Sequence, residues 1–187
     1  MLTTRGCGIL LHPTSLPGPG GIGSLGTDAQ RFIDLLYDMG MSYWQVLPLT
    51  PPACGNSPYS AFTAFGGNPL LIDLEQISRE GDLSCASCSG LYPVDRVDFT
   101  AVAGPKMELL YHAAATFLTR NETPRSLEFR HFCETTPWLH DFTLFMALKR
   151  HFHGKCWRRW PKDASCIRIC HSDCVPLIKS SALSAKR

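Results

Sequence analysis

The apolar positions near the start of the chain form two short runs separated by polar and turn-forming residues. Residues 8–11 are apolar and are bounded by Gly6 and by His12 with Pro13, which predicts a short strand that is covered on both faces. Residues 43–47 form a second strand-like run that stops at Pro48. Between them, residues 13–26 hold three prolines and five glycines, so this stretch is predicted to be a long loop.

A helix is predicted between the two runs, over residues 27–39. Thr27 and Gln30 fit a capping box at its start, and Gly40 is expected to end it. The apolar residues recur at helical spacing and form one face, made of Ala29, Phe32, Ile33, Leu36 and Met39. Strand, loop, helix and strand within 50 residues predict a parallel βαβ unit and therefore an α/β fold class.

Two later segments also have helical signals. One spans residues 105–117, with Pro105 expected in the first turn, and the other spans residues 137–152 and is followed by Gly154. One stripe of large residues in the second helix recurs mostly at helical spacing and is expected to make core contacts. It consists of four aromatic residues and one methionine: Trp138, Phe142, Phe145, Phe152 and Met146. The basic residues 149–159 are interpreted as a solvated helix end that suits the helix dipole.

Length and charge narrow the function classes. The chain has 187 residues, 44% hydrophobic and 18% charged, which is typical of a globular protein with irregular loops. Its 18 basic and 16 acidic residues give a net charge of +2, so neither nucleic acid nor an anionic membrane is expected as a partner. The N-terminal apolar run of four residues is too short for a signal peptide or a membrane span, and we expect a cytoplasmic protein.

Nine cysteines raise the question of disulfides or metal. An odd count without an export signal favours reduced thiols, and the four scattered ones, Cys7, Cys54, Cys133 and Cys156, are expected to be small buried hydrophobic residues. Cys85 and Cys88 form a single C-x-x-C pair, and a zinc ribbon would need a second pair. The spacing of Cys166, Cys170 and Cys174 is weak for zinc, so no metal is predicted.

The composition changes after Asp163. Residues 1–163 hold 14 basic and 15 acidic residues, whereas residues 164–187 hold 4 basic and 1 acidic residue and no aromatic residue. The last 24 residues have neither helical periodicity nor a capping signal. We expect residues 1–163 to form the structured part and residues 164–187 to be a disordered tail that is unrelated to it.

Two motifs suggest chemistry, and each has a simpler explanation. Gly21, Gly23 and Gly26 match the G-x-G-x-x-G pattern of dinucleotide sites, but the preceding strand ends about ten residues too early and the next strand lacks the acidic residue that would hold a ribose. Arg96-Val-Asp98 resembles the arginine-nucleophile pattern of retaining α-glucan enzymes, but no strand-like run precedes it. No convincing pair of carboxylates for retaining catalysis is present.

Several long motifs resemble one family. GILLHPTSLPGPGGIGSLG, SYWQVLPLTPP, GNSPYSAFTAFGGNPLLIDL and WLHDFTLFMALKRHFHGKCWRRWP are similar, in this order, to segments of the amylomaltases, which are 4-α-glucanotransferases. The resemblance covers Arg5 to about Asp163. It implies part of an elaborated (β/α)8 barrel with an inserted subdomain, transfer of α-1,4-glucan segments to a sugar 4-hydroxyl with retention, and no cofactor.

The resemblance also implies a set of substrate-binding residues. The loop with Asn56, Ser57 and Tyr59 matches the family's donor-groove loop, and Tyr59 is expected to stack on a glucose ring or to hydrogen-bond to it. His12 and Gln45 are weaker candidates, because they lie near the C-terminal ends of the two predicted strands, where barrel enzymes place their sites. The partners implied are α-1,4-glucans and maltooligosaccharides.

The chain also departs from the family pattern. Cys54 replaces a tyrosine of an accessory glucan-binding site, and the family's nucleophile and acid/base residues have no counterpart here, so no catalytic residue is assigned. We therefore expect the N-terminal part of such an enzyme, from a truncated or frameshifted reading frame, that is inactive alone. The alternatives are a non-catalytic remnant that binds maltooligosaccharide weakly and a nucleotide-binding module.

Overall fold

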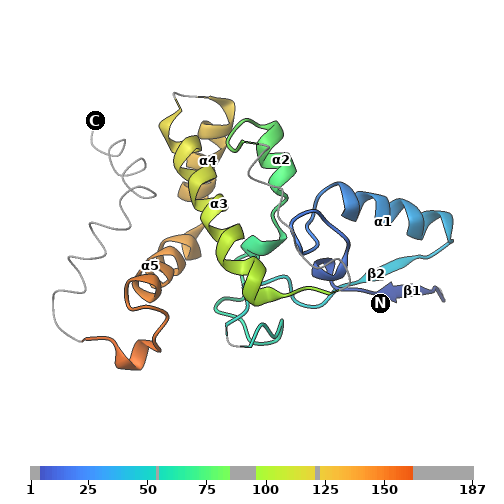
Figure 1. Cartoon of the computed structure of the whole chain (residues 1–187), viewed down its shortest axis with the longest axis horizontal. Helices are drawn as coiled ribbons and strands as arrows, with labels where there is room; N and C mark the ends of the chain where they lie inside the picture. The colour runs from blue at the N-terminus through green and yellow to red at the C-terminus, as the bar shows by residue number, and fades with distance from the viewer. Residues whose placement is uncertain (1–4, 54, 85–95, 121–122, 162–187) are drawn as a thin grey trace. The chain divides into compact units, whose positions relative to one another are not determined.

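The computed structural model describes residues 5–53, 55–84, 96–120 and 123–161 (Figure 1). The elements in chain order are β1 (Gly8–Leu10), η1 (Pro13–Ser15), α1 (Thr27–Asp38), β2 (Tyr43–Gln45), η2 (Pro69–Leu71), α2 (Leu74–Arg79), α3 (Phe99–Thr119), α4 (Pro124–Thr135), α5 (Pro137–His151) and η4 (Trp157–Arg159). The chain divides into two compact units, Met1–Thr116 and Phe117–Arg187, and each is described separately.

The predicted βαβ unit is present in the first unit. β1 and β2 pair in parallel, with Gly8 opposite Tyr43 and Leu10 opposite Gln45, and α1 connects them (Figure 1). The expectation that the first strand is buried on both faces was wrong, because Gly8 and Leu10 are exposed and only Ile9 is half-buried. The reason is that the sheet within the described residues has just two strands, too few to cover both faces.

The two ends of α1 are formed by backbone groups and not by capping side chains. Gly26 occupies the N-cap position and has no side chain that could cap the helix, so the capping box predicted from Thr27 was wrong. At the other end Gly40 has a φ of 70° and donates its N–H to the carbonyl of Tyr37, while Met41 donates to Leu36. This is a Schellman motif, and it confirms Gly40 as the residue that ends the helix.

One part of the predicted apolar face of α1 is buried. Ala29 and Leu36 are buried, and the ring of Phe32 meets Trp44 of β2 edge-on with centroids 5.0 Å apart. Trp44 also donates its indole N–H to the Leu11 carbonyl at 2.8 Å, which ties β2 to the residue after β1. Two residues of the predicted face, Ile33 and Met39, are exposed.

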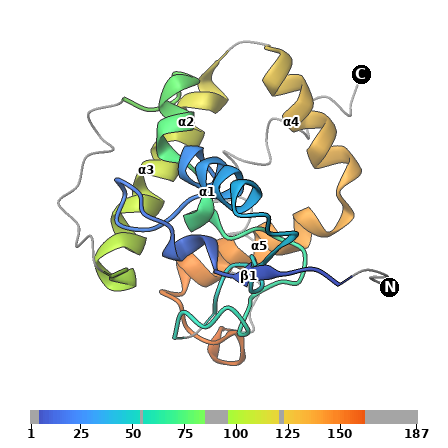
Figure 2. The same ribbon diagram turned by 90° about the vertical axis from the view of Figure 1, so that its right-hand side faces the viewer.

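Helix α3 begins earlier than its proline suggests. Asp98 accepts hydrogen bonds from the N–H groups of Thr100 and Ala101 at 3.0 and 3.1 Å, so the helix begins at Phe99 and Pro105 lies inside it. The prediction that Pro105 occupies the first turn was therefore wrong. Figure 2 shows α2 beside α3, and their buried residues join two apolar clusters, Ile22 with Leu70 and Val102, and Leu74 with Leu83 and Ala113.

Among its described residues the second unit contains the α-helices α4 and α5, of which α4 was not predicted. Thr123 and Ser126 form a capping box at the start of α4, and Phe129 of this helix meets Phe117 with centroids 5.7 Å apart. The predicted helix over residues 137–152 is confirmed as α5, and Gly154 follows it with a φ of 75°. Its aromatic residues are half-buried rather than fully buried, and Trp160 packs against two of them, Phe145 and Phe152.

Candidate functional site

The glycine-rich loop before α1 folds against its own neighbours. Gly23 donates its N–H to the Thr14 carbonyl at 3.0 Å, and a Cβ at Gly23 would overlap the backbone of Pro13 and Leu16. A Cβ at Gly26 would overlap the carboxylate of Asp73. The close approach of other chain segments accounts for these glycines, and a carboxylate at Gly26 is unfavourable for a phosphate group.

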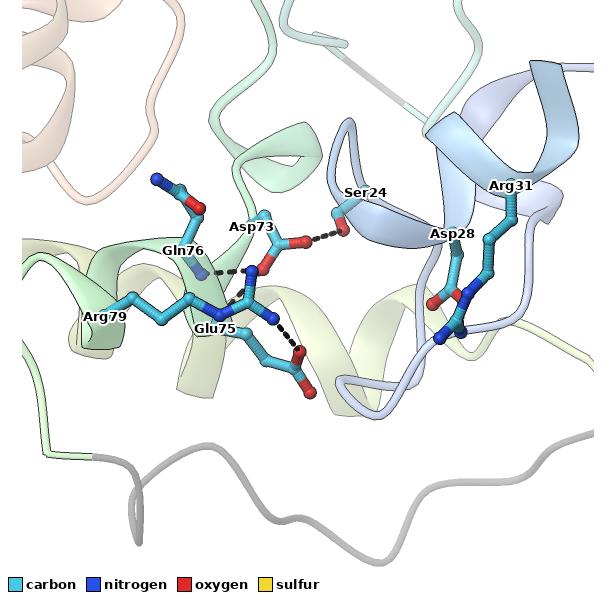
Figure 3. A network of polar contacts seen from close by, with 7 residues as sticks. All are labelled: Ser24, Asp28, Arg31, Asp73, Glu75, Gln76 and Arg79. Carbon is cyan, nitrogen blue, oxygen red and sulfur yellow. Dashed lines mark hydrogen bonds and ion pairs between the residues drawn. The ribbon is translucent and has the colours of Figure 1, made fainter. Parts of the chain in front are cut away.

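The Asp73 carboxylate connects this loop to α2 through hydrogen bonds (Figure 3). One carboxylate oxygen accepts from the N–H groups of Glu75 and Gln76 at 2.8 and 3.0 Å, and the other accepts from the Ser24 hydroxyl at 3.2 Å. Lys106 lies near this network and is buried, and its ammonium group donates a hydrogen bond to the Leu70 carbonyl at 2.7 Å. Burial lowers the pKa of Lys106 from 10.5 to about 8, and the nearby Asp73 opposes that shift. The hydrogen bonds of Asp73 and Lys106 connect these segments of the chain.

The loop after β2 carries three predicted binding residues. An antiparallel bridge between Pro52 and Ala61 closes the loop, and the Ser60 N–H donates to the Ser57 carbonyl at 3.0 Å. Asn56 has a φ of 55°, a left-handed conformation that asparagine tolerates better than most residues. Tyr59 is 75% exposed, so its ring lies open on the loop, whereas Ser57 is half-buried.

His12 follows β1 and caps the short helix η1. Its Nδ1 accepts from the Thr14 N–H at 3.3 Å and lies 2.8 Å from the Thr14 hydroxyl. Pro13 next to it is fully buried and fixes the chain in the turn. The other ring nitrogen of His12, Nε2, is buried and has no hydrogen-bond partner among the described residues.

A cavity of about 200 Å³ brings two of the predicted site residues together, His12 and Asn56, which are far apart in the sequence. The three other predicted residues, Ser57, Tyr59 and Gln45, are not part of its lining. Gln45 is exposed in β2, and its backbone carbonyl accepts from the Leu11 N–H at 3.1 Å. The full lining is His12, Thr14, Leu47, Pro48, Thr50, Pro52, Asn56, Pro58, Asn68 and Phe99.

Three polar lining residues, Thr14, Thr50 and Asn68, were missed by the sequence analysis. The signal for Asn68 was available, because Asn68-Pro69 repeats the arrangement of His12-Pro13: a side-chain acceptor directly before a proline that starts a short helix. A second hollow, of about 790 Å³, lies between the start of α1 and α2; its charged lining residues are Asp73, Arg79 and Glu80.

The other candidates have structural roles or lie outside the described residues. Asp98 caps α3, which explains Arg96-Val-Asp98 without a catalytic role. The expectation of buried thiols was wrong for Cys7 and Cys156, which are exposed, while burial raises the pKa of the half-buried Cys133, with a smaller effect from Glu134. Within the described ranges no group of side chains could hold a metal ion. Outside those ranges lie Cys54, Cys85, Cys88, Cys166, Cys170, Cys174 and the tail 164–187.

The helices of the described part are also informative about membranes. None of them combines the length and the apolar character that a membrane crossing requires.

The sequence is similar to known proteins over most of its length. A family model described as 4-alpha-glucanotransferase matches residues 11–171. A 4-alpha-glucanotransferase of Synechocystis is 44% identical over 166 residues, covering 87% of this chain and 33% of that protein, and the Thermus thermophilus enzyme is 43% identical over 158 residues, covering 84% and 31%. The chain thus spans about a third of these relatives.

The structure is similar to a solved enzyme of the same kind. The amylomaltase from Streptococcus agalactiae in complex with acarbose has a TM-score of 0.84 and 31% sequence identity, covering 96% of this chain and 38% of the amylomaltase. The predicted resemblance to the amylomaltases is confirmed by these matches.

Proposed function

Because this chain belongs to the 4-alpha-glucanotransferase family, we propose that it forms the N-terminal part of a (β/α)8 barrel enzyme that transfers α-1,4-glucan segments to a sugar 4-hydroxyl with retention. The observation that carries this proposal is the likeness, at a TM-score of 0.84, to an amylomaltase solved with acarbose. The parallel pairing of β1 and β2 across α1 supports it, because this is the repeating unit of such a barrel.

Within that enzyme, the proposed role of the described residues is to bind the glucan. Tyr59 offers an exposed ring whose face can cover the C–H surface of a sugar while its hydroxyl finds a polar partner. Ser57 and Asn56 beside it supply a hydroxyl and an amide, which suit the neutral hydroxyl groups of maltooligosaccharides. The closed loop from Pro52 to Ala61 holds these groups together.

The proposed role does not extend to covalent catalysis. Retaining transfer needs a carboxylate that holds the sugar covalently and a second acid that protonates the leaving oxygen and later deprotonates the incoming hydroxyl. The one carboxylate in a nucleophile-like pattern, Asp98, is engaged by two backbone N–H groups at the start of α3. We propose that neither catalytic carboxylate comes from these 187 residues.

Calorimetric titration of the 187-residue chain with maltotriose tests the binding role. Replacing the exposed ring in Tyr59→Ala is expected to weaken binding roughly three- to tenfold, because the stacking surface is lost. Tyr37 provides a matched control, since it is 82% exposed on α1 and distant in sequence from the loop. Tyr37→Ala should leave the affinity unchanged.

The outcomes separate the possible functions. Equal affinities for the wild type and Tyr59→Ala would remove Tyr59 from the site, and no binding of maltotriose by the wild type would contradict the binding role as a whole. Titration with NAD in place of maltotriose tests the nucleotide-binding alternative, which the carboxylate of Asp73 beside Gly26 makes unfavourable.

A further inference from the structure

Two turns of this protein are built alike and line the same cavity. His12 and Asn68 each precede a proline, each has an extended backbone conformation, and each accepts the N–H group two residues later, at 3.3 and 3.0 Å. The backbone closes both turns in the same way, because Leu16 donates to Pro13 at 3.0 Å and Ile72 donates to Pro69 at 3.1 Å. Such a turn needs one acceptor from its cap residue, and asparagine supplies it at position 68.

The second nitrogen of the imidazole is what distinguishes His12 from Asn68. The Thr14 N–H can only donate, so Nδ1 of His12 must present a lone pair to it. The Thr14 hydroxyl at 2.8 Å can rotate to donate to the same atom. In the neutral ring the proton therefore resides on Nε2, and position 12 carries an N–H donor that lies one bond further from the backbone than the amide NH2 of an asparagine in the same turn.

This donor is buried without a partner among the described residues. Burying an unsatisfied polar group is unfavourable, and such groups in native structures call for an explanation. A ligand oxygen that reaches Nε2 would supply the missing hydrogen bond. Since Nε2 is fully covered and His12 lines the cavity, a ligand in the cavity would reach Nε2 after a small movement of the groups that cover it.

The cavity around His12 favours a neutral, hydroxylated ligand. Among the described residues its polar lining consists of hydroxyls, amides and the imidazole, without a carboxylate, ammonium or guanidinium group. Its apolar lining comes largely from three prolines and Phe99, which offer flat surface to C–H groups. With about 200 Å³ the cavity is smaller than a typical drug-sized site, so it suits one small unit rather than a long chain.

We propose that His12 is a substrate-positioning residue whose Nε2–H donates a hydrogen bond to an oxygen of one sugar unit held in this cavity. This inference rests on the proposed glucan-binding function and adds a defined donor, a defined tautomer and a defined place for the sugar. Asn56 is the second polar group from the opposite loop that can hydrogen-bond to the same unit.

The variant His12→Asn tests the proposal because it keeps the acceptor of the turn and replaces the Nε2–H donor with an amide NH2 that ends one bond closer to the backbone. Asparagine should accept the Thr14 N–H as Asn68 accepts that of Leu70, so the midpoint of unfolding should remain close to that of the wild type. Maltotriose affinity is expected to fall roughly tenfold, as for the loss of one hydrogen bond to a buried partner. His140→Asn, at an exposed position of α5, is the matched control and should bind like the wild type.

The imidazole ¹⁵N and ¹H resonances of wild-type chain provide a readout that does not depend on a variant. The proposal requires a proton on Nε2 and none on Nδ1, together with a shift of the Nε2–H signal when maltotriose is added. A proton on Nδ1, an Nε2–H signal unmoved by saturating maltotriose, or equal affinities of a folded His12→Asn and the wild type would each overturn the role of His12 while leaving the glucan function in place. Failure of the wild type to bind maltotriose would overturn both.

Discussion

The Ser24 hydroxyl donates a hydrogen bond to the Asp73 carboxylate at 3.2 Å, across 49 positions of the sequence. The same carboxylate caps α2, so one side chain connects the loop before α1 to the start of the next helix (Figure 3). The bond therefore joins two segments that are far apart in the sequence.

Removal of the Asp73 side chain is expected to destabilise the chain more than removal of its single long-range donor. Asp73→Ala loses the helix cap and leaves the Ser24 hydroxyl without this acceptor, which should lower the free energy of unfolding by about 2 kcal/mol. Ser24→Ala should lower it by about 1 kcal/mol. Urea titration measures both, with Glu75→Gln as the control, because the exposed Glu75–Arg79 pair at 3.4 Å contributes at most about 0.5 kcal/mol.

The double variant gives an independent check on that bond. If Ser24 and Asp73 act as described, the two losses should not add, and the coupling should be about 0.5 kcal/mol or more. Strict additivity would show that the two side chains stabilise the chain independently.

Gly26 and Gly20 are expected to respond in opposite ways to the same substitution. Gly26→Ala places a methyl group against the Asp73 carboxylate and should cost about 1 to 3 kcal/mol of stability, as overpacking does. Nothing lies within 4 Å of a Cβ at Gly20, so Gly20→Ala should be neutral or slightly stabilising. Thermal unfolding of both variants compares them. A stable Gly26→Ala would mean that Asp73 moves aside at little cost.

Lys106 is expected to make stability increase with pH in the alkaline range. Burial lowers the pKa of Lys106 to about 8 in the folded chain, whereas the unfolded chain keeps the ordinary value of 10.5. Between these values the unfolded state binds more protons, so the free energy of unfolding should rise with pH. At about 1.4 kcal/mol per pKa unit, the contribution of this group reaches on the order of 3 kcal/mol.

The variant Lys106→Met isolates that contribution from other alkaline titrations. It should lose the rise in stability between pH 8 and pH 10.5 that the wild type shows, as measured by urea titration across this range. At pH 7 the variant keeps the apolar contacts but leaves the Leu70 carbonyl without the Lys106 donor. Parallel pH curves for the two proteins would show that Lys106 keeps its ordinary affinity for protons.

Asp98→Ala is expected to affect folding and not chemistry. The carboxylate caps α3, so the substitution should lower the free energy of unfolding by about 1 kcal/mol. We further expect the 187-residue chain to release no glucose and to form no longer maltooligosaccharides from maltotriose, as followed by chromatography. Disproportionation by the wild type that Asp98→Ala abolishes would restore Asp98 as a nucleophile.

Local sequence patterns were sufficient to predict the βαβ unit. The end of α1 was predictable because Gly40 is the residue that most easily adopts a φ of 70° after a helix. The start of α3 was not, because Pro105 is typical of a first turn while the true cap, Asp98, lies seven residues earlier and resembles an ordinary loop aspartate. The exposure of Ile33 and Met39 was likewise hidden, because helical periodicity shows which face is apolar and not how much of it is covered.

The sequence suggested candidate site residues but not how they are arranged. The family motif identified His12 and Asn56 separately, yet their common cavity depends on how the loop after β2 returns toward β1. That path is set by backbone contacts such as the bridge from Pro52 to Ala61 and the hydrogen bond from Asn68 to Leu49 at 2.7 Å. Such contacts join backbone groups that every residue carries, so no sequence pattern marks them.

Side chains alternate between the two sides of the three-residue strand β2, and this alternation limits which length changes the preceding connection can accept. Trp44 faces α1 through its contact with Phe32, and since neighbouring side chains in a strand alternate, Tyr43 and Gln45 face away from that helix. Inserting or deleting one residue between Gly40 and Tyr43 would exchange these sides, directing the indole away from the helix and the glutamine amide against it. Length changes in this connection should therefore be tolerated in steps of two residues, a rule that a small insertion library with a folding reporter can test.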